Sequence, residues 1–413
     1  MIRILIADDS AFMRKVLTDL FKKQPDFDVV GTATNGRDAV EKVKQLHPDL
    51  LTLDVQMPVM DGLNALAVIM EVSPMPVVML SSLTQEGTDE TIRALSLGAI
   101  DFISKAGGSI SRIDTIESDI LAKCRAAAKA NVKRALTGTR AAEKAESERL
   151  AKEKSAPRGM HHVELPKRTG FKLPSKAGGA ELQAKSASPF AKRENPLLAR
   201  RNKPTLTPHA VPSSSAMPAA SGQGSGKLVA IGTSTGGPQA LQNVITRLPG
   251  DLPCGVVVVQ HMPAGFTKSL ANRLNTLSKV EVKEAEDGEI IKPGHVYIAP
   301  GNYHMRVASA GSARKIVLGQ DPPVGNHRPA VNVLYDSVAP IGKKLVAVIM
   351  TGMGSDGTEG MKKIKAQGGY SIAQDESTCA VYGMPKSVVD AGLADEVRPV
   401  TDIARAIVAA VGK

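Results

Sequence analysis

One serine in the sequence lies in a setting that suggests nucleophilic chemistry. The stretch Gly232–Gly236 reads Gly-Thr-Ser-Thr-Gly and fits the G-x-S-x-G pattern of a nucleophile elbow with Ser234 at its centre. The apolar run Leu228–Gly232 precedes it, and a helix is expected over Pro238–Arg247. Such a strand-to-helix turn exposes the hydroxyl, and the helix N-terminus offers N–H groups to a developing oxyanion. A turn that only N-caps a helix or binds a phosphate would have the same composition.

A serine hydroxyl needs a base near neutral pH, and imidazole is suited to that task. His261 follows the apolar run Gly255–Gln260, and Asp356 follows the run Leu345–Thr351 after a short loop. We expect both runs to be strands of one parallel sheet, so that the two side chains meet Ser234 at its carboxyl edge. The carboxylate would fix the imidazole tautomer and stabilise the imidazolium that forms.

Both partners of the serine also have a purely structural interpretation. His261 would then only end its strand. Asp356 would N-cap the helix expected over Gly357–Ala366, with Glu359 completing a capping box. Three further histidines are alternative bases, namely His295, His304 and His327. The strongest of them is His327, which we expect to lie in a substrate groove.

A second group of polar residues follows the apolar runs of the N-terminal region. In chain order these residues are Asp8, Asp9, Asp54, Ser81 and Lys105. Carboxylates that converge on one sheet edge favour a hard divalent cation such as Mg²⁺. A lysine and a hydroxyl beside them would hold a phosphoryl group on one carboxylate, as in aspartyl-phosphate chemistry. Each residue alone could be a helix cap or a solvated charge, but five at successive strand ends favour a phosphoacceptor site.

Hydrophobic periodicity predicts the elements that must position both groups. In residues 1–122 strands are expected over Ile2–Ala7, Val29–Ala33, Leu50–Leu53, Val77–Leu80 and Ile100–Ile103, and helices over Ser10–Lys22, Arg37–Leu46, Leu63–Val72 and Thr88–Leu97. In residues 227–413 strands are expected over Leu228–Gly232, Gly255–Gln260, Val296–Ala299 and Leu345–Thr351, and helices over Pro238–Arg247, Thr267–Leu277, Gly357–Ala366 and Pro385–Ala391. This alternation predicts two α/β domains, each with a doubly wound, parallel sheet.

Composition separates the two domains and limits their environment. The net charge of +11 is concentrated between Arg125 and Gly226, where 20 Lys and Arg face 7 Asp and Glu among many prolines. We therefore interpret residues 123–226 as a long, basic, flexible linker, although it could contact nucleic acid or anionic lipid. The scattered cysteines (Cys124, Cys254, Cys379) are compatible with a reducing cytoplasm. No apolar run is long enough to insert in a membrane.

The motifs resemble two known families. The residues around Asp8-Asp9, Leu53-Asp54-Val-Gln-Met-Pro58 and Ser104-Lys105 resemble a response-regulator receiver, which has a flavodoxin-like fold. Gly232-Thr-Ser-Thr-Gly-Gly237, Gln260-His-Met-Pro263 and Thr351-Gly-Met-Gly-Ser-Asp-Gly357 resemble the Rossmann-like catalytic domain of chemotaxis protein-glutamate methylesterases. The order Ser, His, Asp is not that of the α/β-hydrolases.

The resemblance implies a function for both domains. It implies that a histidine kinase of the chemotaxis system phosphorylates Asp54, with Mg²⁺ held by Asp8, Asp9 and Asp54, and that Ser81 and Lys105 sense the phosphoryl group. In the second domain it implies a catalytic triad of Ser234, His261 and Asp356. The backbone N–H groups of Thr235 and Met353 would then form the oxyanion hole.

The implied substrates are methyl-accepting chemoreceptors. Their glutamate γ-methyl esters would be hydrolysed and specific glutamines deamidated, without a cofactor in the esterase site. We do not expect nucleic-acid binding. We expect recruitment to receptor arrays in the cytoplasm. A phosphorylation-controlled scaffold, and an array that serves an output other than motility, stay open as alternatives.

Overall fold

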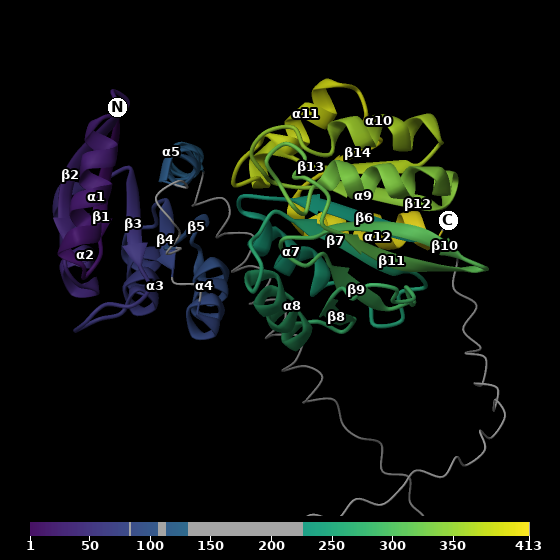
Figure 1. Cartoon of the computed structure of the whole chain (residues 1–413), viewed down its shortest axis with the longest axis horizontal. Helices are drawn as coiled ribbons and strands as arrows, with labels where there is room; N and C mark the ends of the chain where they lie inside the picture. Colours follow the sequence, from purple (N-terminus) through teal and green to yellow (C-terminus); the bar gives the residue numbers. More distant parts are fainter. Residues whose placement is uncertain (82–83, 106–112, 131–225, 413) are drawn as a thin grey trace, which may run out of the picture. The chain divides into compact units, whose positions relative to one another are not determined.

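The structure, a computed structural model, describes residues 1–81, 84–105, 113–130 and 226–412 (Figure 1). The described parts of both α/β domains belong to one compact unit. The interpretation of residues 131–225 as a linker falls outside the described residues. No described helix is both long enough and apolar enough to cross a membrane.

The first domain alternates strands and helices along the chain. Its elements are β1 (Ile2–Ala7), α1 (Ala11–Lys22), β2 (Phe27–Ala33), α2 (Gly36–Leu46), β3 (Leu50–Asp54), α3 (Gly62–Val72), β4 (Val77–Ser81), α4 (Gln85–Leu97), β5 (Asp101–Ser104) and α5 (Ile113–Ala128). The strands form one parallel sheet in the order β2-β1-β3-β4-β5, which confirms the predicted fold class. Helix α5 continues past the boundary that we expected at residue 122, because its apolar face extends to the buried Cys124 and Ala127.

The second domain has a larger sheet. Its elements are β6 (Leu228–Thr233), α7 (Gly237–Ile245), β7 (Gly255–Gln260), α8 (Phe266–Leu277), β8 (Glu281–Glu284), β9 (His295–Ile298), β10 (His304–Ala310), β11 (Ala313–Gly319), α9 (Val331–Val338), η2 (Ala339–Lys344), β12 (Leu345–Ile349), α10 (Thr358–Ala366), β13 (Tyr370–Gln374), η3 (Glu376–Thr378), α11 (Met384–Asp390), β14 (Glu396–Arg398) and α12 (Val400–Gly412). Seven parallel strands follow the order β14-β13-β12-β6-β7-β9-β8, as predicted for a parallel sheet. Strands β10 and β11 form a separate antiparallel hairpin.

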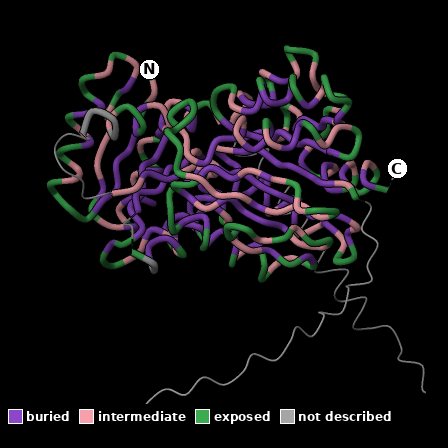
Figure 2. Tube along the Cα trace, turned by 45° about the vertical axis from the view of Figure 1, so that its right-hand side comes forward, coloured by how far each residue is buried: buried purple, intermediate pink, exposed green. Residues whose placement is uncertain are grey.

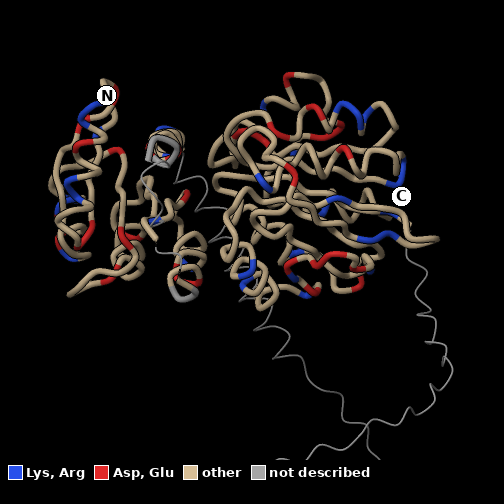
Figure 3. The backbone as a smooth tube through the Cα atoms, viewed as in Figure 1, with Lys and Arg blue, Asp and Glu red and all other residues tan. Residues whose placement is uncertain are grey.

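The central strands of this sheet are buried on both faces. Along β6, Val229 and Ile231 pack in a core with α7, α8 and α12, whereas Leu228 and Ala230 pack with α9, α10 and α11. Alternate side chains of a strand point to opposite faces, so a strand covered on both sides is apolar throughout. Figure 2 shows these buried strands, and in Figure 3 they carry no charged residues. Polar chemistry is therefore confined to the strand ends.

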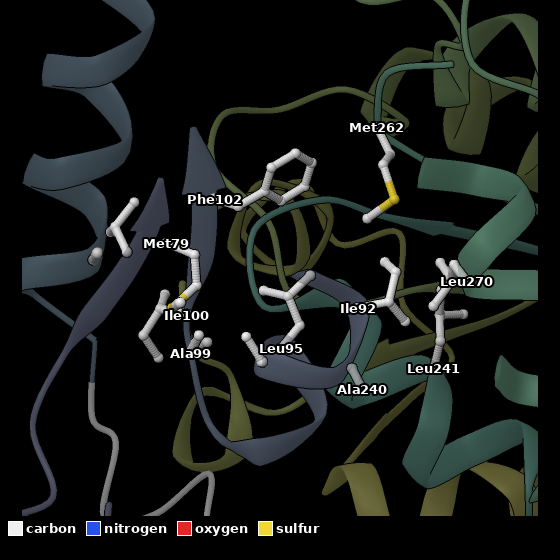
Figure 4. Close-up of a cluster of buried hydrophobic side chains, with 14 of the residues drawn as sticks. Met79, Ile92, Leu95, Ala99, Ile100, Phe102, Ala240, Leu241, Met262 and Leu270 are labelled. Atoms are coloured by element: carbon white, nitrogen blue, oxygen red, sulfur yellow. The ribbon is translucent and has the colours of Figure 1, made fainter. Parts of the chain in front are cut away.

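Apolar packing also joins the two domains. Ile92 of α4 and Phe102 of β5 belong to the same buried cluster as Leu241 of α7 and Leu270 of α8 (Figure 4). Phe102 stacks on Phe266, with ring centroids 4.3 Å apart. The first domain thus contacts the second through α4 and β5.

Candidate functional sites

Three carboxylates lie together at the carboxyl edge of the first sheet. Asp8 and Asp9 directly follow β1, Asp54 ends β3, and one carboxylate oxygen of each lies within 4.8 Å of the others. Lys105 Nζ is 2.8 Å from both Asp8 Oδ2 and Asp54 Oδ2. The structure therefore brings together four of the five residues that the sequence placed at this edge, and their oxygen donors fit Mg²⁺.

Burial and ion pairing act against each other in this cluster. Burial raises the pKa of Asp54 above its ordinary value, although the hydrogen bond and charge of Lys105 act to lower it. Burial lowers the pKa of Lys105, but its hydrogen bonds to Asp54 and Asp8 outweigh that effect and the pKa is raised. Lys105 therefore stays protonated at neutral pH and holds two carboxylates at once.

Ser81, the fifth residue, has hydrogen bonds toward α4. Its Oγ donates to the carbonyl oxygen of Gly87 at 3.1 Å and accepts from Thr91 Oγ1 at 2.5 Å. Contact between Ser81 and a group carried by Asp54 would compete with these bonds. Such an exchange would couple the first sheet's edge to α4.

Ser234 lies directly after β6, on the turn that the glycine spacing predicts. Gly236 has a φ of +75°, and a Cβ there would stand 2.4 Å from Ala380 Cβ, so this position requires glycine. The Ser234 N–H donates to the Thr351 carbonyl at 3.0 Å, and the Ser234 carbonyl accepts from the Gly237 N–H at 2.7 Å. The turn is thereby fixed to the chain that follows β12.

His261 and Asp356 form the hydrogen-bonded pair that the sequence predicted. His261 Nε2 is 2.8 Å from Asp356 Oδ2. Asp356 also accepts from the backbone N–H groups of Val331 at 2.7 Å and Asn332 at 2.9 Å, in the first turn of α9. The N-cap of α10 is Gly357, so Asp356 does not cap the helix that follows it.

The environment of Asp356 favours its ionised form. Burial by itself raises the pKa of this carboxyl group. The hydrogen bond and charge of His261 and the two N–H groups of α9 outweigh burial, and the pKa lies below its ordinary value. The positive end of the α9 dipole contributes in the same direction. Asp356 is therefore an anion at neutral pH.

Ser234 and His261 are not hydrogen-bonded to each other. His261 Nδ1 is buried and has no hydrogen-bond partner among the described residues. Because Nε2 binds Asp356, Nδ1 is the nitrogen left to accept a proton. The strands β6 and β7 that carry Ser234 and His261 are adjacent, with Thr233 paired to Gln260.

The other histidines occupy distinct positions. The ring of His327 stacks on His261, with centroids 3.8 Å apart and planes 12° apart. Burial and the neighbouring His261 lower the pKa of His327 to about 4. His304 bonds Pro322 and Ala330, and His295 bonds Pro293 and Glu281. Neither is available as a base for Ser234.

The backbone N–H groups predicted to form the oxyanion hole have no hydrogen-bond acceptor among the described residues. Among the hydrogen bonds of the described residues, none uses the backbone N–H of Thr235 or Met353. The Thr235 hydroxyl donates to Asp101 Oδ2 at 2.7 Å, and the Gly236 N–H donates to the Ile100 carbonyl at 3.1 Å. Asp101, the first residue of β5, and Ile100, which precedes it, thus contact the turn that carries the serine.

Two buried polar residues at strand ends were not given a role from the sequence. Thr351 Oγ1 donates to the Thr235 carbonyl at 3.0 Å. Gln260 Nε2 donates to the carbonyls of Ser234 at 3.0 Å and His261 at 3.1 Å. The sequence did contain a signal for both residues, because a polar side chain at the end of a buried strand needs a hydrogen-bond partner.

Comparison with known proteins identifies both domains. The sequence matches the CheB methylesterase family over residues 229–407 and the response regulator receiver domain over residues 4–115. The protein-glutamate methylesterase/protein-glutamine glutaminase of Symbiobacterium thermophilum is 45% identical, over 100% of this chain and 98% of its own. That of Halalkalibacterium halodurans is 41% identical, over 98% of this chain and 97% of its own. The Thermotoga maritima CheB methylesterase catalytic domain is 50% identical, with 44% of this chain and 97% of its own covered and a TM-score of 0.44. The chain belongs to the family of CheB methylesterases that carry a receiver domain.

Proposed function

We propose that this chain hydrolyses glutamate γ-methyl esters of chemoreceptors and deamidates receptor glutamines, under the control of its receiver domain. The observation that carries this proposal is the His261–Asp356 pair, which lies at the strand edge where Ser234 follows β6. Family membership gives the reaction, and the pair supplies a base for it. The scaffold alternative gives no reason for a buried histidine with one unpartnered nitrogen.

The proposed reaction proceeds through an acyl-enzyme. Ser234 Oγ attacks the ester carbonyl while His261 Nδ1 accepts its proton, and Asp356 stabilises the imidazolium. The tetrahedral intermediate collapses, the C–O bond to the methoxy group breaks, and His261 returns the proton so that methanol leaves. Water activated by His261 then cleaves the acyl-enzyme to glutamate and free Ser234. With a glutamine substrate the leaving group is ammonia.

We assign the oxyanion hole to the backbone N–H groups of Thr235 and Met353. Both lack another acceptor among the described residues, which supports the assignment. Preorganised donors of this kind stabilise the negative oxygen of the intermediate more than the carbonyl of the substrate. Thr351 supports one of them, because its hydroxyl binds the Thr235 carbonyl.

We further propose that Asp54 is the phosphoacceptor and that a histidine kinase of the chemotaxis system is the donor. Asp8, Asp9 and Asp54 would hold Mg²⁺, which neutralises phosphoryl charge when bound. Lys105 already contacts Asp54 and would pair with the phosphoryl oxygens. Ser81 would exchange its bonds to α4 for the phosphoryl group. The enzyme would act at chemoreceptor arrays in the cytoplasm.

Replacement of the nucleophile tests the esterase proposal. Ser234→Ala should lower methanol release from a methylated receptor fragment by at least about 10³-fold, because no other group forms the acyl-enzyme. Ser309→Ala is the matched control, since Ser309 is exposed on β10. Full activity of Ser234→Ala would overturn the assignment. A protein that binds receptors equally well with and without this substitution, but never releases methanol, would favour the scaffold.

A further inference from the structure

One side chain joins the backbones of the two residues that react. Gln260 ends β7 immediately before His261, and only 2% of its surface is exposed. Its Nε2 donates one hydrogen bond to the Ser234 carbonyl at 3.0 Å and another to the His261 carbonyl at 3.1 Å. Both protons of the amide are thus used, one on each catalytic residue.

The orientation of this amide is fixed by its surroundings. A flipped amide would place Oε1 against two carbonyl oxygens, and three acceptors would lie together without a donor. In the observed orientation Oε1 is buried and has no partner among the described residues. An unpaired buried oxygen costs free energy, and the two hydrogen bonds that Nε2 donates offset this cost.

The turn sequence also accommodates Gln260. A Cβ at Gly237 would stand 2.0 Å from Gln260 Oε1 and 2.3 Å from Thr233 Oγ1. Any side chain there would displace the amide from the turn. Gly237 is therefore required because Gln260 approaches it closely, whereas Gly236 is required because its backbone is in the left-handed region.

We propose that Gln260 is a positioning residue that sets the distance and orientation of Ser234 relative to His261. The inference rests on the proposed function, because it presumes that these two residues react together. The geometry matters because the two side chains are not hydrogen-bonded before substrate binds, so their approach depends on the backbones that carry them. A misplacement of about 1 Å in such a pair costs as much as about 10²-fold in rate.

Two substitutions of similar shape test this role. Gln260→Met removes both donors without adding charge, and Gln260→Glu places acceptors against the two carbonyls. Each should lower kcat on a methylated receptor fragment by about 10- to 100-fold and leave KM unchanged, because substrate contacts are not altered. Gln367→Met is the matched control, since Gln367 is exposed at the end of α10.

The pH dependence separates positioning from a general loss of structure. When the carboxyl group introduced by Gln260→Glu is protonated, it can donate one hydrogen bond. The ratio of kcat for Gln260→Glu to kcat for Gln260→Met should therefore rise as the pH is lowered. A ratio that does not change with pH would contradict the role of donated bonds.

The remaining outcomes also decide the question. Wild-type kcat in a folded Gln260→Met protein would overturn the inference. If Gln260→Met does not fold, Gln260→Asn keeps an amide on a shorter arm, and its wild-type kcat would equally overturn it. Ser234→Ala is measured beside these variants. If Ser234→Ala is inactive while Gln260→Met is fully active, this inference alone has failed; if Ser234→Ala is active, the proposed function has failed.

Discussion

At the scale of single residues, His261 is held on two sides. Asp356 binds Nε2, and because Asp356 accepts only, Nε2 carries the proton and Nδ1 is the basic nitrogen. Asp356 cannot rotate freely, because its two oxygens also accept N–H groups of Val331 and Asn332. His327 covers one face of the ring. The ring of His261 is thus fixed in its tautomer and in its plane.

His327 makes the stability of the second domain depend on pH. Its pKa is lowered from 6.5 to about 4 in the folded chain. Between these values the unfolded chain binds a proton that the folded chain does not, so stability falls as the pH drops through this window and the loss is complete below it. His327→Gln should therefore show a smaller decrease in thermal midpoint than the wild type when the pH is lowered from about 7 to 5.

The pH range from about 7 to 8 is an internal control for the comparison of His327→Gln with the wild type. Between about pH 7 and 8 His327 is neutral in the folded chain and mostly neutral in the unfolded one, so variant and wild type should change alike. An equal decrease of both proteins between pH 7 and 5 would show that His327 is not buried as a neutral ring.

At the scale of elements, α9 links the core to the site. Its N-terminus supplies the two N–H groups that Asp356 accepts, and Tyr335, one turn later, donates its hydroxyl to the Val348 carbonyl of β12 at 2.6 Å. Gly232 permits this close packing, since a Cβ there would stand 2.4 Å from Val331 Cγ1. The position of the Asp356 carboxylate therefore depends on how α9 packs on β6 and β12.

Removal of one hydroxyl tests that dependence. Tyr335→Phe leaves the ring packed but deletes the buried hydrogen bond to Val348, which should reduce the free energy of unfolding of the second domain by roughly 1–2 kcal/mol. Activity should fall more than in Tyr303→Phe, the matched control on an exposed loop. Urea unfolding and methanol release are measured on both. Unchanged stability of Tyr335→Phe would mean that this bond does not hold α9.

Most of the strands that are buried on both faces could be predicted from the sequence, but β13, which is also buried, and the hairpin of β10 and β11 were not predicted. Strands β6, β7 and β12 are apolar along nearly their whole length, and the helices predicted beside them have apolar residues at three- and four-residue spacing. The edge strands β8 and β14 were missed because they are short and polar. Helix α9 was missed because the residues Val331–Val338 include three valines and a tyrosine, which favour a strand as much as a helix.

The site divides in the same way. Residues at strand ends were predictable, since a parallel sheet collects them at one edge, and Asp8, Asp9, Asp54 and Lys105 do lie together there. The hydrogen bonds of Asp356 to α9 and the stack of His327 were not predictable. They depend on how segments distant in sequence pack, which no local pattern encodes.

At the scale of the whole molecule, the first domain contacts the turn that carries Ser234. Asp101 accepts from the Thr235 hydroxyl, the Ile100 carbonyl accepts from the Gly236 N–H, and Phe102 stacks on Phe266. Strand β5 pairs with β4, where Ser104 lies opposite Ser81. A change in the hydrogen bonds of Ser81 would therefore act next to a strand that also contacts the turn of Ser234.

These contacts predict that the unphosphorylated first domain lowers esterase activity. A large protein substrate would have to reach Ser234, and the neighbouring Thr235 and Gly236 are hydrogen-bonded to Asp101 and Ile100 of the first domain. The segment 227–413 alone should release methanol faster than the full chain, and an acyl phosphate donor should raise the activity of the full chain but not that of the segment. Asp54→Asn in the full chain is the control, since it should abolish the response to the donor while leaving basal activity. The segment lacks the contacts of Asp101 and Ile100. Equal activities of the segment and the full chain would therefore show that these contacts do not restrain the turn that carries Ser234.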